Sequence, residues 1–186
     1  FPDYLQQLDM ESNGKSLRLD GRPVGTHTAP VLWGGAGSNT QHAYFQMLHQ
    51  GGVLIPSDFI AFVESDFPLP GHHEKLLANC FAQAEALAFG SDDGDPLRAC
   101  PGNQPSSTLL LPRLDPYRLG QLIAAYEHKV CAQAAIWGIN PFDQWGVELG
   151  KKLAARLLPG IEDPDTRVAT DSSTAGLLRW YHRQKH

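Results

Sequence analysis

The spacing of apolar residues predicts amphipathic helices along much of the chain. Over residues 72–89, apolar side chains recur at i, i+3 and i+4, and Gly90 ends the pattern. A second helix begins where Asp115 can cap it and Pro116 fits its first position. Its apolar stripe consists of Leu119, Leu122, Ile123, Tyr126 and Val130. The same pattern, read together with helix caps and breakers, predicts further helices at 3–11, 39–50, 141–158 and 174–183.

Short apolar runs between these helices predict β-strands at 16–19, 29–33, 53–63 and 107–111. Strands that alternate with helices in units of this size imply right-handed crossovers, and therefore a mainly parallel sheet in an α/β fold. Ligands of such sheets bind beyond the carboxyl ends of the strands. The glycine-rich loop from Gly34 to Gly37 is therefore a candidate anion site, although loops of this kind are common.

Composition narrows the class of protein. The 186 residues suit one domain, or one domain with an appendage, and a hydrophobic content of 42% is typical of a globular protein. The net charge of −5 and the lack of a Lys/Arg cluster argue against nucleic-acid binding, and no apolar run reaches membrane-spanning length. Three cysteines without metal-ribbon spacing, and no signal peptide, indicate reduced thiols in a cytoplasmic protein. Because the chain starts at Phe1 without an initiator Met, we expect a fragment of a longer protein.

Gln7 and Glu11 form the first candidate site. They are one helical turn apart and share a face of the predicted helix 3–11. Glu11 would lie at the carboxyl end of that helix, where the macrodipole disfavours a carboxylate, as suits a base that must hold a proton briefly. The alternative is a solvated helix end without chemistry.

His42 is a second candidate, because a histidine just after the glycine-rich loop can act as an acid or a base near neutral pH. His49 follows two turns later, but an i, i+7 pair is too widely spaced for one metal ion, so no metal is expected. An ordinary helix histidine is the alternative. Gln144 and Lys151 share one face of the helix 141–158. Gln144 would lie in its first turn, where free N–H groups attract phosphate; the alternative is a solvated polar face.

Composition and spacing by themselves predict no more than an α/β domain with plausible anion and acid–base sites. Three segments around these residues, however, resemble a known family. Residues 4–15 resemble the segment of glucose-6-phosphate isomerases that holds the catalytic glutamate. Residues 33–51 resemble the segment with the active-site histidine, and residues 142–151 resemble the C-terminal signature of the family. The likeness spans nearly the whole chain.

The resemblance implies a three-layer sandwich with a mainly parallel sheet, the sugar-isomerase (SIS-type) fold, over residues 1–140, with a C-terminal helical arm over 141–186. It implies the C-terminal portion of a cytoplasmic enzyme of glycolysis and gluconeogenesis. This enzyme is an intramolecular oxidoreductase that interconverts glucose 6-phosphate and fructose 6-phosphate through a cis-enediol, without metal or organic cofactor. The implied partners are the sugar-phosphate substrate, the N-terminal half of the same protein and a second copy in a homodimer with a shared active site. Nucleic acid and membranes are not among them.

Each candidate residue gains a role from the resemblance. Glu11 would be the base that moves a proton between carbons 2 and 1 of the sugar. His42 would assist ring opening, and Lys151 would act near the ring oxygen and the carbon-1 hydroxyl. Gln7 and Gln144 would lie at the phosphate end of the substrate.

The chain also departs from the family pattern. The segment 34–40 differs from the usual glycine-rich sequence, the loop 91–101 is shorter, and Gln104 replaces a common arginine. The phosphate loop and an arginine that the N-terminal half of the family supplies are not found in this sequence, so the chain alone should be nearly inactive. The alternatives are a non-catalytic sugar-phosphate-binding module of the same fold and an interaction protein acting outside the cell.

Overall fold

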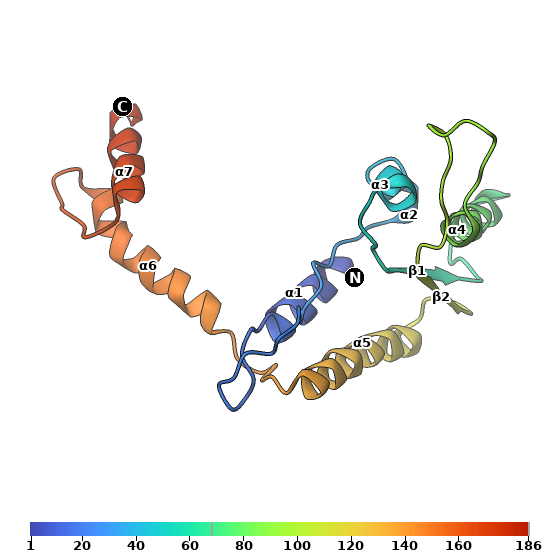
Figure 1. Ribbon diagram of the computed structural model, residues 1–186, viewed down its shortest axis with the longest axis horizontal. Coiled ribbons are helices and arrows are strands. Elements are labelled where there is room, and N and C mark those ends of the chain that lie inside the picture. Colours follow the sequence, from blue (N-terminus) through green and yellow to red (C-terminus); the bar gives the residue numbers. More distant parts are fainter. Residues whose placement is uncertain (68, 186) are drawn as a thin grey trace. The chain divides into compact units, whose positions relative to one another are not determined.

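The computed structural model describes residues 1–67 and 69–185, which form two compact units, Phe1–Ile139 and Asn140–His186 (Figure 1). The first unit contains α1 (Pro2–Asn13), α2 (Gly37–Thr40), α3 (Phe45–Gln50), β1 (Ser57–Phe62), α4 (His72–Phe89), β2 (Ser106–Leu111) and α5 (Pro116–Trp137). The second contains α6 (Trp145–Glu162) and α7 (Ser172–Gln184). In the described part of the chain, no helix is both long and apolar enough to cross a membrane.

The sheet of the first unit confirms the predicted α/β class and its parallel pairing. β1 and β2 run parallel, in a register that pairs Ser57 with Ser106 and Phe62 with Leu111. The crossover between them contains α4, which contacts both strands. Leu87 of α4 is almost fully buried and forms a core cluster with Phe45 and Leu48 of α3, against which Trp33, Tyr44, Ile55 and Phe59 pack. Burial of these apolar side chains holds α3 and α4 together near the sheet.

The helices α1 and α5 lie side by side, although more than a hundred residues separate them in the sequence (Figure 1). The buried side of α5 consists of Leu122, Tyr126, Val130 and Ala134, which are four residues apart and therefore share one face. The Phe1 ring meets the Tyr126 ring edge-on, with centroids 5.6 Å apart. The Tyr4 hydroxyl donates a hydrogen bond of 2.9 Å to Glu127. An aromatic contact and a hydrogen bond thus hold the start of α1 against α5.

Two predicted strands and one predicted helix are wrong in detail. Residues 16–19 and 29–33 form no strand; an isolated antiparallel bridge joins Leu17 to Pro23, and Gly21 takes a positive φ in the turn between them. Among the described residues, neither run pairs with a strand of the sheet, and the first run forms a local turn instead. The predicted helix 39–50 is broken into α2 and α3 because Tyr44 leaves helical geometry and packs its ring edge-on against Trp33. The predicted strand 53–63 is confirmed only as the shorter β1.

The second unit starts later than predicted. α6 begins at Trp145, because Asn140 accepts a hydrogen bond from the Phe142 amide and so caps a preceding turn, not the helix. Pro159 does not end α6, which continues to Glu162. The Gly160 carbonyl accepts a hydrogen bond of 2.7 Å from His182 Nε2, which ties α7 to α6.

Candidate active site

Gln7 and Glu11 lie on α1 one turn apart, as their spacing predicts. At 100° per residue they are about 40° apart around the helix axis. The buried face of α1, which carries Leu5, Asp9 and Asn13, lies on the opposite side. Gln7 is exposed and Glu11 is half-buried, so both side chains can reach a ligand.

A cation lies close to the end of the helix that carries Glu11. Lys15 Nζ donates hydrogen bonds of 2.8 Å to the carbonyls of Glu11 and Ser12. These carbonyls belong to the last turn of α1, where the helix leaves its acceptors unsatisfied. Lys15 therefore places a positive charge at the negative end of the helix dipole, next to the backbone of Glu11.

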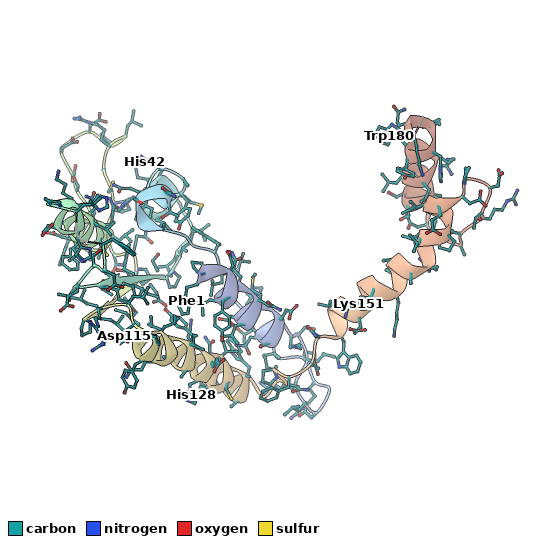
Figure 2. The ribbon with its side chains drawn as sticks, turned by 180° about the vertical axis from the view of Figure 1, so that it is seen from behind. Phe1, His42, Asp115, His128, Lys151 and Trp180 are labelled. Atoms are coloured by element: carbon teal, nitrogen blue, oxygen red, sulfur yellow. The ribbon has the colours of Figure 1, made fainter. Side chains whose placement is uncertain are left out.

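His42 lies in the turn between α2 and α3, and its side chain is exposed to solvent (Figure 2). His49 is different, because its Nε2 lies 2.8 Å from Gln83 Oε1 and ties α3 to α4. The two histidines predicted on one helix therefore occupy different environments. Among the described residues, no three His, Cys, Asp or Glu side chains are grouped so that they could hold a metal ion.

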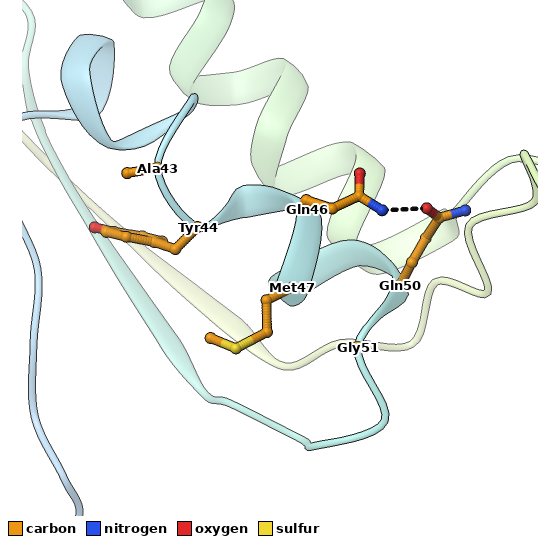
Figure 3. Close-up of a pocket in the computed structure, with 6 residues that line it drawn as sticks. All are labelled: Ala43, Tyr44, Gln46, Met47, Gln50 and Gly51. Atoms are coloured by element: carbon orange, nitrogen blue, oxygen red, sulfur yellow. Dashed lines mark hydrogen bonds between the residues drawn. The ribbon is translucent and has the colours of Figure 1, made fainter.

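A shallow hollow of about 460 Å³ lies immediately after His42 in the sequence (Figure 3). It is lined by Ala43, Tyr44, Gln46, Met47, Gln50 and Gly51. None of these side chains carries a charge, and Gln46 Nε2 donates a hydrogen bond of 2.5 Å to Gln50 Oε1 across the rim. The hollow contains none of the five candidate residues. Without a charged group it is poorly suited to hold a phosphate, so the hollow is not the candidate site.

Gln144 and Lys151 belong to the second unit. The sequence predicts Gln144 in the first turn of its helix, but the structure makes it the N-cap residue, one position before α6 begins. Its side chain is exposed and makes no capping hydrogen bond, so its amide is available beside the free N–H groups of the helix start. Lys151 is exposed and its Nζ lies 2.7 Å from Glu148 Oε1. Gln7 and Glu11 thus lie together on α1, whereas His42 belongs to a separate segment of the first unit, and Gln144 and Lys151 belong to the second unit.

Two tyrosines near the α1–α5 contact have raised pKa values because of the groups around them. Burial, and then a hydrogen bond of 2.9 Å donated to Asp58, raise the pKa of the Tyr126 hydroxyl well above its usual range. The hydrogen bond to Glu127 raises the pKa of Tyr4. Both hydroxyls therefore stay protonated near neutral pH and act as donors that join α5 to β1 and to α1.

Sequence reasoning missed Asp9 and Asn13. These polar residues lie on the buried face of α1, with 2% and 0% of their surface exposed. Their spacing of four residues, in line with Leu5, puts them on one face of the helix, but polar residues on a helix are ordinarily assigned to the solvent face.

The chain matches the family model described as Phosphoglucose isomerase over residues 1–178. It is 57% identical to a glucose-6-phosphate isomerase of Dechloromonas aromatica and 52% identical to one of Deinococcus radiodurans. These alignments cover 96% and 100% of the chain, and 36% of each relative. The crystal structure of a glucose-6-phosphate isomerase from Chlamydia trachomatis matches with a TM-score of 0.84 and 41% identity, over 100% of the chain and 36% of that protein. The chain thus spans little more than a third of the length of these relatives.

Proposed function

The chain belongs to the phosphoglucose isomerase family, and we propose that it supplies part of the active site of an enzyme that interconverts glucose 6-phosphate and fructose 6-phosphate. The observation that carries this proposal is the family match over residues 1–178, which includes all five candidate residues. The reaction is an aldose–ketose isomerisation within one sugar molecule. It moves one proton between two carbons and another between two oxygens, with no net oxidation.

Glu11 is the proposed base. Its carboxylate takes the proton from carbon 2 of the open-chain aldose and returns it to carbon 1 of the cis-enediol. Its half-buried position on α1 supports this role, because a base must reach the substrate and still be held in a fixed direction. Gln7, on the same face, is proposed to contact the phosphate end of the substrate.

His42 and Lys151 are the proposed partners in opening the sugar ring. The side chain of His42 is exposed, and an imidazole is a common general acid or base in catalysis. Lys151 would act near the ring oxygen and the carbon-1 hydroxyl, and Gln144 would bind phosphate together with the start of α6.

The remaining parts of the site are proposed to lie elsewhere. The family resemblance implies a phosphate loop and an arginine from the rest of a longer protein, and a histidine contributed across a homodimer. We place residues 1–140 in the sugar-isomerase (SIS) domain and residues 141–186 in a helical arm. We further propose that the enzyme acts in the cytoplasm, in glycolysis and gluconeogenesis.

The test is a coupled assay of the full-length protein that carries this chain, with fructose 6-phosphate as substrate. Formation of glucose 6-phosphate at an ordinary enzymatic rate is the expected result. Sugar-phosphate binding without turnover would instead favour a non-catalytic binding module. The absence of both binding and turnover would overturn the proposal.

A further inference from the structure

The contact between α1 and α5 contains a buried polar cluster. Asn13 Nδ2 lies 3.1 Å from Asp9 Oδ1, 3.3 Å from the Val130 carbonyl oxygen and 3.5 Å from Gln133 Oε1. Asp9 and Asn13 are 2% and 0% exposed. We call Asp9, Asn13 and Gln133, with the Val130 carbonyl, the α1–α5 lock. The Asn13 amide is its centre, because it donates to both helices.

The lock leaves one buried polar atom unpaired. Within the described part of the chain, the buried Asn13 Oδ1 has no hydrogen-bond partner, which costs stability. The hydrogen bonds of Asn13 Nδ2 offset this cost, because an apolar side chain in its place would leave the buried Asp9 Oδ1 and the Val130 carbonyl without this donor. The lock also has a directional consequence, since hydrogen bonds restrict orientation more strictly than apolar contacts do.

The direction that the lock fixes is that of Glu11. Glu11 is two residues from both Asp9 and Asn13, and so lies about 160° from each of them around the helix axis. A carboxylate about 6 Å from the axis moves about 1 Å for every 10° that the helix turns. The backbone of α1 thus transmits the orientation of the buried Asn13 amide to the opposite face of the helix.

We propose that Asn13, together with Asp9, is a positioning residue that holds the rotation of α1 and thereby aims Glu11 at the substrate. This inference rests on the proposed function of Glu11 as the base. Asn13 lies on the far side of the helix from that base, and it acts through the helix it anchors.

The experiment compares two variants of the full-length protein that carries this chain. Asn13→Leu removes the lock while keeping the size of the side chain. Leu5→Val is the matched control, because it trims the same buried face of α1 and leaves the lock intact. We expect Asn13→Leu to lower kcat about 10²-fold, the scale of an error of about 1 Å in catalytic geometry. KM should change by a smaller factor than kcat, since Gln7, which turns with Glu11, is only one of the contacts proposed for the phosphate.

A kinetic isotope effect separates positioning from simple destabilisation. With glucose 6-phosphate deuterated at carbon 2 as substrate, the isotope effect on kcat should rise in Asn13→Leu, because proton transfer becomes rate-limiting. Leu5→Val should lower the unfolding midpoint and leave kcat and the isotope effect unchanged. If Asn13→Leu lowers only the unfolding midpoint, the residue is merely structural and the inference is wrong.

Two further measurements cover the remaining outcomes. If Asn13→Leu does not fold, Gln133→Leu removes one partner of the lock from the α5 side. Gln133→Leu should also lower kcat, by a smaller factor than expected for Asn13→Leu. An unchanged kcat would overturn the inference. If the wild-type protein shows no isomerase activity, the proposed function fails by itself. Amide hydrogen exchange over α1 then tests the lock, and equal exchange in Asn13→Leu and Leu5→Val would overturn it.

Discussion

Glu11 lies on the face of α1 that points away from α5, while its neighbours two positions away are buried. Replacing it by glutamine keeps the size of the side chain and removes the base. We expect Glu11→Gln in the full-length protein to lower kcat about 10²–10⁴-fold, the usual contribution of a positioned base. Binding of a sugar phosphate, measured by titration calorimetry, should persist because Gln7 is unchanged.

The control for this substitution is Glu85→Gln, which neutralises an exposed carboxylate on α4. It should leave kcat and KM as they are. Equal losses in the two variants would mean that net charge, and not the chemistry of Glu11, causes the effect. Unchanged activity in Glu11→Gln would remove Glu11 from its proposed role.

At the residue scale, spacing placed Gln7 and Glu11 together correctly, because one helical turn puts any such pair on one face. It could not identify Asp9 and Asn13 as buried. Burial of a polar side chain depends on acceptors from another part of the chain, here the Val130 carbonyl and Gln133. Local patterns in the sequence contain no information about those acceptors.

Elements with strong local signals were predicted well. α5 begins where Asp115 accepts a hydrogen bond of 2.8 Å from the Arg118 amide, as its cap residue requires. α4 has the predicted bounds, because its apolar spacing and Gly90 both mark them. The strands predicted at 16–19 and 29–33 failed because a strand needs a partner, and a short apolar run does not specify one. The start of α6 was misplaced because Asn140 can cap a turn as well as a helix.

Gly102 lies where its backbone passes close to the backbone of Phe89 and Gly90, so its replacement should affect stability. Gly102 has a φ of +68°, and a Cβ at this position would lie 2.6 Å from the Gly90 amide nitrogen. Gly102→Ala should therefore destabilise the protein by more than about 1 kcal/mol, through both the strained φ and the clash. Urea unfolding would measure this loss.

The matched control is Gly120→Ala on α5, where a Cβ meets nothing within 4 Å. It should stabilise the protein by about 0.5–1 kcal/mol, because alanine is the better helix former. A stable Gly102→Ala variant would show that the two backbone segments can separate without cost.

The cap of α7 predicts a pH dependence. Hydrogen bonds from the Thr174 hydroxyl and the Thr174 and Ser173 amides lower the pKa of Asp171 from 3.8 to about 2. The unfolded chain binds this proton more readily, so the stabilisation by ionised Asp171 is complete above the unfolded pKa and is lost as the pH falls through about 2. The protection factors of the α7 amides, which are corrected for the intrinsic exchange rate at each pH, should therefore fall between about pH 5 and pH 2.

Asp171→Asn supplies the comparison, because asparagine caps a helix without titrating. The variant should keep α7 protected near neutral pH and lose the acid-induced step that Asp171 causes. An acid transition of the same size in both proteins would assign it to other carboxylates.

At the scale of the whole molecule, each unit exposes apolar surface that folding within the unit does not cover. In the first unit, Ile136 of α5 is 81% exposed, and in the second Trp145 of α6 is 75% exposed. The described part of the sheet has two parallel strands, whereas parallel sheets are ordinarily covered on both faces. Both observations favour further protein surfaces against these units, as the 36% coverage of the relatives also does.

The exposure of the candidate residues predicts the catalytic activity of the chain by itself. In the chain as it stands, His42 and Lys151 are exposed to water, where electrostatic interactions are weak compared with those in a closed site. The 186-residue chain should therefore turn over fructose 6-phosphate at least about 10³-fold more slowly than the full-length protein at equal concentration. Intact mass would verify each sample, and a coupled assay would measure both rates. Comparable rates would mean that Glu11, His42 and Lys151 suffice for catalysis, and that the phosphate contacts proposed for the rest of the protein contribute little to the barrier. A large difference that disappears when the remaining part of the protein is added as a separate chain would assign the missing stabilisation to that part.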